Sequence, residues 1–424
     1  MSSTGRQREC QKEKTFDPLA QKSKQICLPI DQTKYQQIVS TPALFRAELD
    51  QWFQEFPELF PMDMGQGYTW HDILPPSKKM ADLQLRRLKL RATQEVFTVR
   101  PAFVLPYMTG YTAEVEQPLL LRRWAVPYWV LVELFGKDEA YWYRLENRFG
   151  RYSVVGTTVK SPDKLPLDLV ADEKHTDFNG QTAYIATTVG QECVLGASIT
   201  LTADTPNLTE AYGHFKTEAR NLSPHYHPTT VNTDGWQATQ LAWPSLFPFI
   251  TVILCFLHAF LNIRSRAKGL KEQYQALKTR VWAAYHALDR ETFTQQVLDL
   301  QHWAQQSLPD GPALTTVLKL CAKAPTFALA YDYPAAHRTS NMVDRHILAM
   351  SRYLDSCQGY HGHLLSAEYN VRAWALLHNF WPYGPRAKAA KKFISPAHQL
   401  NGRVYHQNWL HNLLISASMG GYVQ

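Results

Sequence analysis

Three acidic residues occur where strand ends and a helix start would place them. Asp172 follows the apolar run Leu-Val-Ala, Asp234 follows Thr-Val-Asn-Thr, and Asp344 opens a segment with helical spacing. Carboxylate oxygens are the ligands that Mg²⁺ and Mn²⁺ prefer. Two such ions about 4 Å apart can clamp the attacking and leaving oxygens of a phosphodiester. The three acids therefore predict a site for two metal ions that acts on phosphodiesters.

Each of these acids also has an ordinary structural role open to it. Asp172 fits a strand-end turn, and Asp168 competes with it from within the same strand. Asp234 precedes Gly235 and fits an Asx turn or a helix N-cap. Asp344 fits an acid that complements a helix N-terminus. The order of the three acids along the predicted elements favours a shared site.

The elements that would deliver the acids alternate between strands and helices. Strands are predicted at 167–171, 181–189 and 193–201, then a helix at 208–221 capped by Asn207, a strand at 229–231, a helix at 235–243 and a strand at 249–254. Three strands, helix, strand, helix, strand is the order of an RNase H-like core. We therefore predict an α/β fold, α+β overall, with a mixed five-stranded sheet formed by residues 165–262.

The composition is that of a folded, basic chain. Its 424 residues suggest two or three domains, and 45% hydrophobic with 19% charged residues excludes general disorder. The net charge is +7, and no Asp or Glu follows Glu368. Basic residues of that last stretch are Arg372, Arg386, Lys388, Lys391, Lys392 and Arg403. A basic C-terminal tail over 384–424 would suit a phosphate backbone, although a solvated tail is the alternative.

The region before the sheet is expected to bind DNA. Residues 1–40 are predicted to form a flexible arm, and 41–160 a mostly helical unit. Candidate helices at 119–126, 127–135 and 137–149, with Gly136 as a C-cap, resemble a helix-turn-helix. Candidate DNA contacts in their last part are Arg144, Arg148, Arg151 and Lys160. A three-helix unit that binds nothing is an equal alternative.

The cysteines and the apolar segments favour a cytoplasmic protein. None of the six cysteines forms a CxxC pair, and no signal peptide is indicated. Residues 241–263 carry no formal charge and would be long enough to span a bilayer. Pro244, Pro248 and a β-branched run interrupt that stretch and favour a buried strand instead. We therefore expect no membrane segment.

Several short motifs follow one another between Asp172 and Phe380. They are Asp172-Glu-Lys-His, Thr233-Asp234-Gly235, Cys255-x-x-His258, Ser340-Asn341 before Asp344-Arg345, Tyr369-Asn-Val-Arg and His378-Asn-Phe. In this order they resemble the catalytic domain of DDE-type insertion-sequence transposases, in the branch that includes Mutator-like elements. The resemblance covers about half of the chain.

This resemblance implies an RNase H-like fold with a helical insertion between the second and third acids, here at 263–335, and closing helices at 336–383. The family's third acid is usually Glu, whereas this chain offers Asp344. The site is then a DDD variant, or the third ligand is Glu368 or Asp332. Arg345 would contact a phosphate or form a surface salt bridge. A lone Cys255-x-x-His258 is more often packing than a metal ligand.

The implied function is a transposase that cuts DNA at the ends of its element and joins the freed 3′-hydroxyl to target DNA. Its partners would be terminal inverted repeats and target DNA, bound by a homodimer or larger assembly in the bacterial cytoplasm, at the nucleoid. Two alternatives stay open: an RNase H-like nuclease or resolvase without strand transfer, and a catalytically inactive DNA-binding protein.

Overall fold

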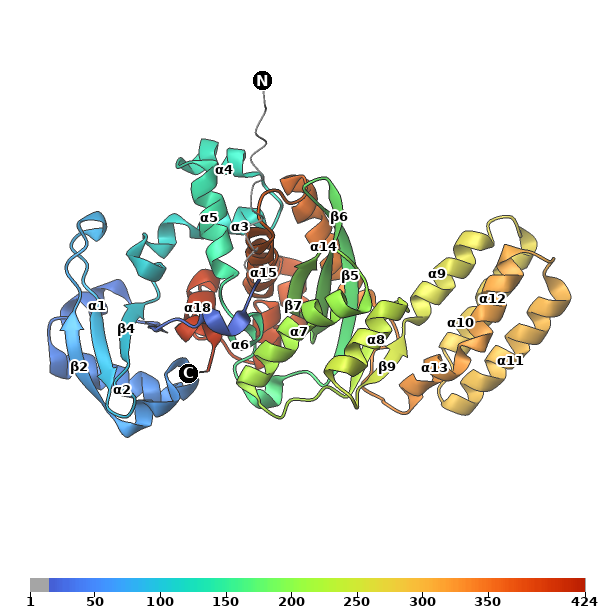
Figure 1. Ribbon diagram of the computed structural model, residues 1–424, viewed down its shortest axis with the longest axis horizontal. Coiled ribbons are helices and arrows are strands. Elements are labelled where there is room, and N and C mark those ends of the chain that lie inside the picture. Colours follow the sequence, from blue (N-terminus) through green and yellow to red (C-terminus); the bar gives the residue numbers. More distant parts are fainter. Residues whose placement is uncertain (1–14, 424) are drawn as a thin grey trace, which may run out of the picture.

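The computed structural model describes residues 15–423, and three parts follow one another along its longest axis (Figure 1). A small four-stranded sheet lies at one end, a five-stranded sheet packed between helices lies in the middle, and a lobe of helices lies at the other end. The predicted combination of helices and a mixed five-stranded sheet is confirmed.

The first sheet comprises β1 (Gln25–Leu28), β2 (Tyr68–Ile73), β3 (Arg86–Leu90) and β4 (Val96–Pro101) in the order β1-β4-β3-β2. Helices α1 (Gln32–Ile38) and α2 (Pro42–Glu55) follow β1. Ile26, Cys27 and Leu28 are completely buried, so the predicted flexible arm is wrong from residue 15 onwards, and residues 1–14 lie outside the described part. The prediction that 41–160 is mostly helical also missed this sheet, because the segment that forms β3 was interpreted only as a basic run.

Four helices link the first sheet to the centre: α3 (Glu116–Arg122), α4 (Tyr128–Phe135), α5 (Glu139–Phe149) and α6 (Val154–Thr158). Gly136 ends α4 with a φ of +70°, a left-handed conformation that favours glycine, as predicted. Helix α5 buries Trp142, Leu145 and Phe149 and packs against α15 (Leu364–Phe380). This helical unit is therefore joined to the central core.

The central sheet has the order β7-β6-β5-β8-β9. Its strands are β5 (Asp168–Phe178), β6 (Gln181–Gly190), β7 (Cys193–Thr200), β8 (Thr230–Thr233) and β9 (Thr251–Leu254). Strands β5, β6 and β7 form an antiparallel meander, whereas β5, β8 and β9 are parallel. Helices α7 (Thr205–Leu222) and α8 (Gln237–Leu246) pack together beside this sheet. The N-cap of α7 is Asp204, which accepts from the Asn207 amide, and not Asn207 as predicted.

The helical lobe occupies the predicted insertion. It contains α9 (Phe256–Arg266), α10 (Glu272–Tyr285), α11 (Arg290–Ser307), α12 (Pro312–Ala322) and α13 (Ala324–Ala328), with a separate hydrophobic core. Within residues 15–423 no single helix has the length and apolar character to cross a membrane. One bent pair, Pro312–Ala322 and Ala324–Tyr331 at 49°, meets that test by length and composition alone.

The C-terminal segment is folded. After α14 (Asn341–Cys357) and α15 come α16 (Pro385–Lys391), α17 (Pro396–Asn401) and α18 (Trp409–Ser416). Leu410, Leu413 and Leu414 of α18 are completely buried, and α18 packs against β1. The predicted basic tail over 384–424 is therefore wrong, because the apolar face of α18 draws this segment into the core.

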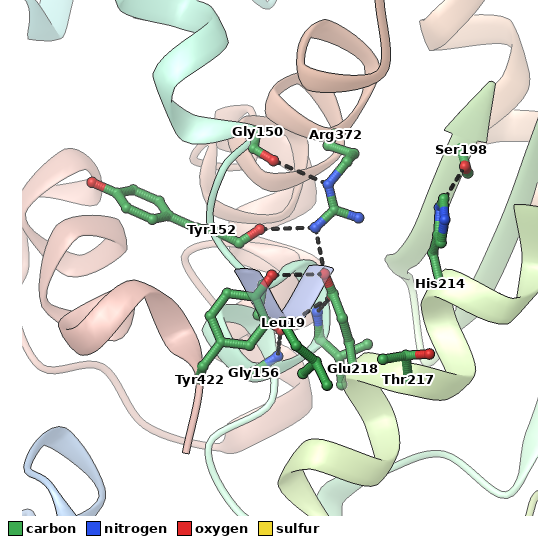
Figure 2. Close-up of polar contacts among 12 residues, drawn as sticks. Leu19, Gly150, Tyr152, Gly156, Ser198, His214, Thr217, Glu218, Arg372 and Tyr422 are labelled. Carbon is green, nitrogen blue, oxygen red and sulfur yellow. Dashed lines mark hydrogen bonds and ion pairs between the residues drawn. The ribbon is translucent and has the colours of Figure 1, made fainter. Parts of the chain in front are cut away.

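Arg372, which was assigned to that basic stretch, is also buried. Figure 2 shows its guanidinium donating to the carbonyl oxygens of Gly150 and Tyr152, both at 3.0 Å, and pairing with the Glu218 carboxylate. The Tyr422 hydroxyl donates to the same carboxylate at 3.3 Å. The ion pair therefore ties α15, α7 and the chain's last residues together, and this arginine is not available to DNA.

Candidate metal centre

Asp172 lies where β5 leaves its parallel neighbour. Strand β5 pairs with β8 only from Asp168 to Val170 and then continues against β6. Asp172 is therefore inside a strand, and the prediction of a strand end at this residue was wrong. Asp172 nevertheless follows the last residue of β5 that pairs with β8, so it lies at the carboxyl end of β8. In open α/β sheets, ligands commonly bind at the carboxyl ends of the strands.

Asp234 follows the last residue of β8 and reaches the same edge. Its Oδ1 accepts from the Trp236 amide at 2.8 Å, so the predicted Asx turn is present. Gly235 has a φ of +103°, which allows the chain to turn here. One ligand atom each from Asp172, Glu173 and Asp234 lies within 4.8 Å of the others. Asp234 therefore both forms the Asx turn and belongs to this group of possible metal ligands.

A second group shares Asp172. One ligand atom each from Asp172, His258 and Asp344 lies within 4.8 Å of the others. His258 belongs to the first turn of α9, directly after β9, and Asp344 to the first turn of α14. Strands β5 and β8 and helices α9 and α14 therefore converge on a single acidic site.

Ser340 connects the members of this second group. Its hydroxyl donates to Oδ2 of Asp344 at 3.0 Å and lies 3.2 Å from Nδ1 of His258. Its amide donates to the Cys255 sulfur at 3.2 Å. The Cys255 amide in turn donates to the Thr233 carbonyl at 2.7 Å. Cys255 is buried and belongs to neither ligand group, and these two contacts position its neighbours.

The charges of the site are not balanced. Burial, with the nearby charges of Asp234 and Glu173, raises the pKa of Asp172 to about 7. A hydrogen bond with Cys255, and then the charges of Cys255, Asp172 and Asp344, raise the pKa of His258 to about 9. Within residues 15–423, no lysine or arginine forms an ion pair with the three aspartates. Acidic residues outnumber His258 here, so the site can accept a cation once Asp172 and His258 release their protons.

Glu173 was missed by the sequence reasoning. Its Oε1 accepts from the Tyr212 hydroxyl at 2.7 Å and from the Thr239 hydroxyl at 2.6 Å. Its Oε2 is buried and has no hydrogen-bond partner, although it belongs to a residue of the first ligand group. The available signal was the adjacent Asp-Glu pair, but neighbouring residues of a strand normally point to opposite faces.

The two other candidates for the third acid lie elsewhere. Glu368 accepts from the Ser198 hydroxyl at 3.0 Å and from the Ile199 amide at 2.8 Å. Its neighbour His214 appears beside Ser198 in Figure 2. Asp332 pairs with Arg290 at 2.8 Å in the helical lobe. Asp344 is therefore the acid that the fold brings to Asp172.

The predicted DNA contacts before the sheet divide into exposed and internal groups. Arg144 and Arg148 are exposed on α5, and the exposed Arg151 lies 5.3 Å from the ring of Tyr369. The Lys160 ammonium instead donates to the carbonyls of Gly156 and Ser416, both at 2.7 Å, and burial lowers its pKa to about 8. Lys160 is thus committed to internal contacts, contrary to prediction.

The basic residues near the C-terminus divide in the same way. Arg386, Lys388 and Lys392 are exposed on or beside α16. Lys391 lies 3.3 Å from Glu192, and Arg345 pairs with the same carboxylate at 2.7 Å. The salt-bridge interpretation of Arg345 is therefore confirmed. Asn341 is an exposed residue at the start of α14 and is in neither ligand group.

No protein-family model matches the chain, and no curated protein is found to be similar to it. The functional argument therefore depends on the geometry of the site.

Proposed function

We propose that this protein is a DNA transposase, a polynucleotidyl transferase that cleaves DNA at the ends of its element and joins the freed 3′-hydroxyl to target DNA. The observation that carries the proposal is the convergence of Asp172, Asp234 and Asp344 from β5, the end of β8 and the start of α14. The strand order β7-β6-β5-β8-β9, antiparallel then parallel, supports an RNase H-like core.

The donor set fits two hard cations. Asp172 is shared by both groups, Asp234 and Glu173 complete the first, and Asp344 with His258 completes the second. The unpartnered Oε2 of Glu173 and the raised pKa of Asp172 are both expected where carboxylates await a cation. Mg²⁺, or Mn²⁺, would supply Lewis acidity that activates the attacking oxygen and stabilises the leaving one.

The protein's own residues position this chemistry. Asp234 is fixed by its Asx turn, and Asp344 and His258 are both held by Ser340. The Cys255 amide anchors the start of α9 to the end of β8. These contacts fix the carboxylates before substrate binds, which lowers the reorganisation needed during reaction.

Cleavage and joining assays with the full chain test this proposal. DNA carrying the sequences that flank the gene is incubated with Mg²⁺ or Mn²⁺, and precut ends are offered with a target plasmid. We expect cleavage and strand transfer by the wild type, and loss of both in Asp172→Asn and Asp234→Asn. Asp168→Asn is the matched control, because it makes the same change near the start of β5. Persistent cleavage in both site variants would contradict the metal assignment.

The same assays separate the alternatives. Cleavage without any joining of precut ends would identify a nuclease or resolvase. Specific binding to the ends with no cleavage would identify an inactive DNA-binding protein. Mg²⁺ should also raise the melting temperature of the wild type and of Asp168→Asn, but not of Asp172→Asn, because binding to the folded state stabilises it.

A further inference from the structure

A pocket outside the metal centre lies where the connection after β4 meets α5. It is lined by Lys79, Tyr107, Met108, Thr109, Tyr141, Arg144, Leu145 and Arg148 and has a volume of about 380 Å³. That volume is within the usual range for ligand sites. Its cations come from two separate parts of the chain, the turn around Lys78–Met80 and α5.

The charge of this pocket is mostly uncompensated. Arg144 and Arg148 are exposed and one turn apart on α5, a spacing at which like charges repel each other. Arg144 approaches Asp138 only at 3.8 Å, and neither Lys79 nor Arg148 has an ion-pair partner within residues 15–423. Burial raises the pKa of the lining residue Tyr141, the charge of Glu114 raises it further and Arg148 lowers it, so Glu114 is an acid near this pocket. The pocket therefore retains a positive excess suited to phosphate.

A tight turn presents an aromatic ring beside these cations. Tyr107 is 71% exposed. It has a φ of +60° and Met108 a φ of +53°, as in a type I′ turn, and the pairs Ala81–Asp82 and Gln191–Glu192 share this left-handed conformation. The turn is held by the Met108 amide donating to the Leu105 carbonyl at 3.2 Å and by the Leu105 amide donating to Gly110 at 2.9 Å. The turn therefore holds the Tyr107 ring at the surface, next to the cations that line the pocket.

We propose that this pocket binds a strand of DNA at an unpaired nucleotide. Arg144, Arg148 and Lys79 contact its phosphates, and Tyr107 stacks on the base. Guanidinium groups match phosphate geometry, and an exposed aromatic ring can stack on any base that has left its pair. The choice of DNA rests on the proposed function, which requires strand ends. The binding itself does not require catalysis, so it can be tested separately.

Fluorescence anisotropy with the full chain provides the test. The probes are a labelled oligothymidylate of about 20 nucleotides and a blunt duplex of equal length, titrated at several NaCl concentrations without divalent cation. We expect Tyr107→Ala to weaken oligothymidylate binding about tenfold and Tyr107→Phe to preserve it, because phenylalanine still stacks. Arg144→Ala and Arg148→Ala should each reduce the slope of log affinity against log salt by about 0.7 for the single strand.

Two matched variants control for general surface effects. Phe249→Ala removes a side chain that is 87% exposed, and Lys278→Ala removes an exposed cation on the helical lobe. Both should bind like the wild type, and all variants should keep their melting temperature. Unchanged oligothymidylate affinity in Tyr107→Ala, or unchanged salt slopes in both arginine variants, would overturn the proposal.

The outcome is distinguishable from that of the proposed function. Asp172→Asn should bind oligothymidylate like the wild type while failing to cleave. If Tyr107→Ala and Arg148→Ala cleave and join DNA normally and bind it with wild-type affinity, the pocket does not bind DNA. The transposase proposal would be unaffected by that result. If the wild type never cleaves DNA but its binding still depends on Tyr107 and Arg148, the pocket proposal is supported and the transposase proposal is contradicted.

Discussion

The Glu218 carboxylate and the acids of the candidate metal centre lie in the same central part of the molecule, but they differ in their hydrogen-bond donors and counter-charges. Glu218 accepts from the Ser153 hydroxyl at 3.1 Å and the Val155 amide at 3.0 Å, and Arg372 neutralises its charge. Asp172 accepts from the Glu173 amide at 2.8 Å and lies near Asp234, Glu173 and His258. Glu218 is therefore satisfied by the fold, whereas Asp172 belongs to two groups of side chains that could hold a metal ion.

The contrast separates structural from functional acids. Buried charges are normally paired, because an isolated charge in the interior is strongly unfavourable. Arg122 and Glu146, both fully buried and 2.8 Å apart, follow this rule as Arg372 and Glu218 do. Asp172, Asp234 and Asp344 are half-buried and have no lysine or arginine partner within residues 15–423, so a proton on Asp172, a protonated His258 or a bound cation can offset their mutual repulsion. The lack of a permanent counter-charge, together with the acidity, marks the candidate site.

The largest effect expected from this comparison concerns activity. Asp172→Asn should lower cleavage by at least roughly a thousandfold, which corresponds to about 4 kcal/mol of transition-state stabilisation. It should not lower stability in EDTA, because asparagine removes a charge that burial and neighbouring acids disfavour. Cleavage rates and thermal melts of the same preparations check both points. A loss of activity accompanied by an equal loss of folding would contradict the functional assignment.

The next effect concerns stability. Arg372→Met should destabilise the fold by about 3–5 kcal/mol, because it leaves the Glu218 charge buried without a counter-charge. Denaturant unfolding measures this loss. The double variant Arg372→Met/Glu218→Gln should recover part of it, since neither charge then remains. If the single variant were as stable as the wild type, the proposed contrast between the two regions would be broken.

A largely buried pair of histidines, His346 and His378, avoids unpaired charge by staying neutral. Nδ1 of His346 lies 2.8 Å from Nε2 of His378, whose ring stacks on Trp374. Burial lowers the pKa of His346 to about 4, against a raising effect of Glu192 and further lowering by Arg345 and Lys391. Burial, followed by the charges of His346 and Arg123, also lowers the pKa of His378. Both rings therefore stay neutral near neutral pH.

The sign of the resulting pH dependence follows from linkage. The unfolded histidines take up protons near pH 6.5, whereas the folded ones resist protonation until lower pH, so stability is fully present above about 6.5 and falls as the pH decreases towards about 4. The limiting slope is about 1.4 kcal/mol per pH unit for each histidine. Unfolding free energies at several pH values measure it. His346→Gln should flatten this slope, whereas His225→Gln, an exposed control, should not. A flat wild-type profile would contradict neutral burial.

The local elements were largely predictable from sequence. Runs rich in β-forming residues predicted β6 and β7 nearly to the residue, and Gly136 marked the end of α4 because its positive φ is a local property. The aspartates were found for a similar reason, since each stands beside a recognisable strand or helix. These predictions depend on a few neighbouring residues, whose conformational preferences act over short distances.

Long-range partnerships were not predictable. Arg372 looked like part of a basic tail, because the spacing of charges says nothing about Glu218 on a distant helix. Ser340 bridges Asp344 and His258 only once α14 and α9 pack together. The apolar residues of α18 were a usable signal for a folded C-terminus, but the absence of acids after Glu368 drew the interpretation towards a tail. Tertiary contacts decided each case.

The smallest effect belongs to Arg345, which stands next to Asp344 but outside the cluster. It pairs with Glu192 at 2.7 Å while its side chain is 63% exposed, and Lys391 approaches the same carboxylate at 3.3 Å. Solvent screening makes such surface pairs weak, so Arg345→Ala should change the unfolding free energy by less than about 1 kcal/mol. A double-mutant cycle with Glu192→Gln should give a coupling energy in the same range. A coupling of several kcal/mol would mean that this exposed pair behaves like the buried Arg372–Glu218 pair, and the distinction between the two regions would then not depend on burial.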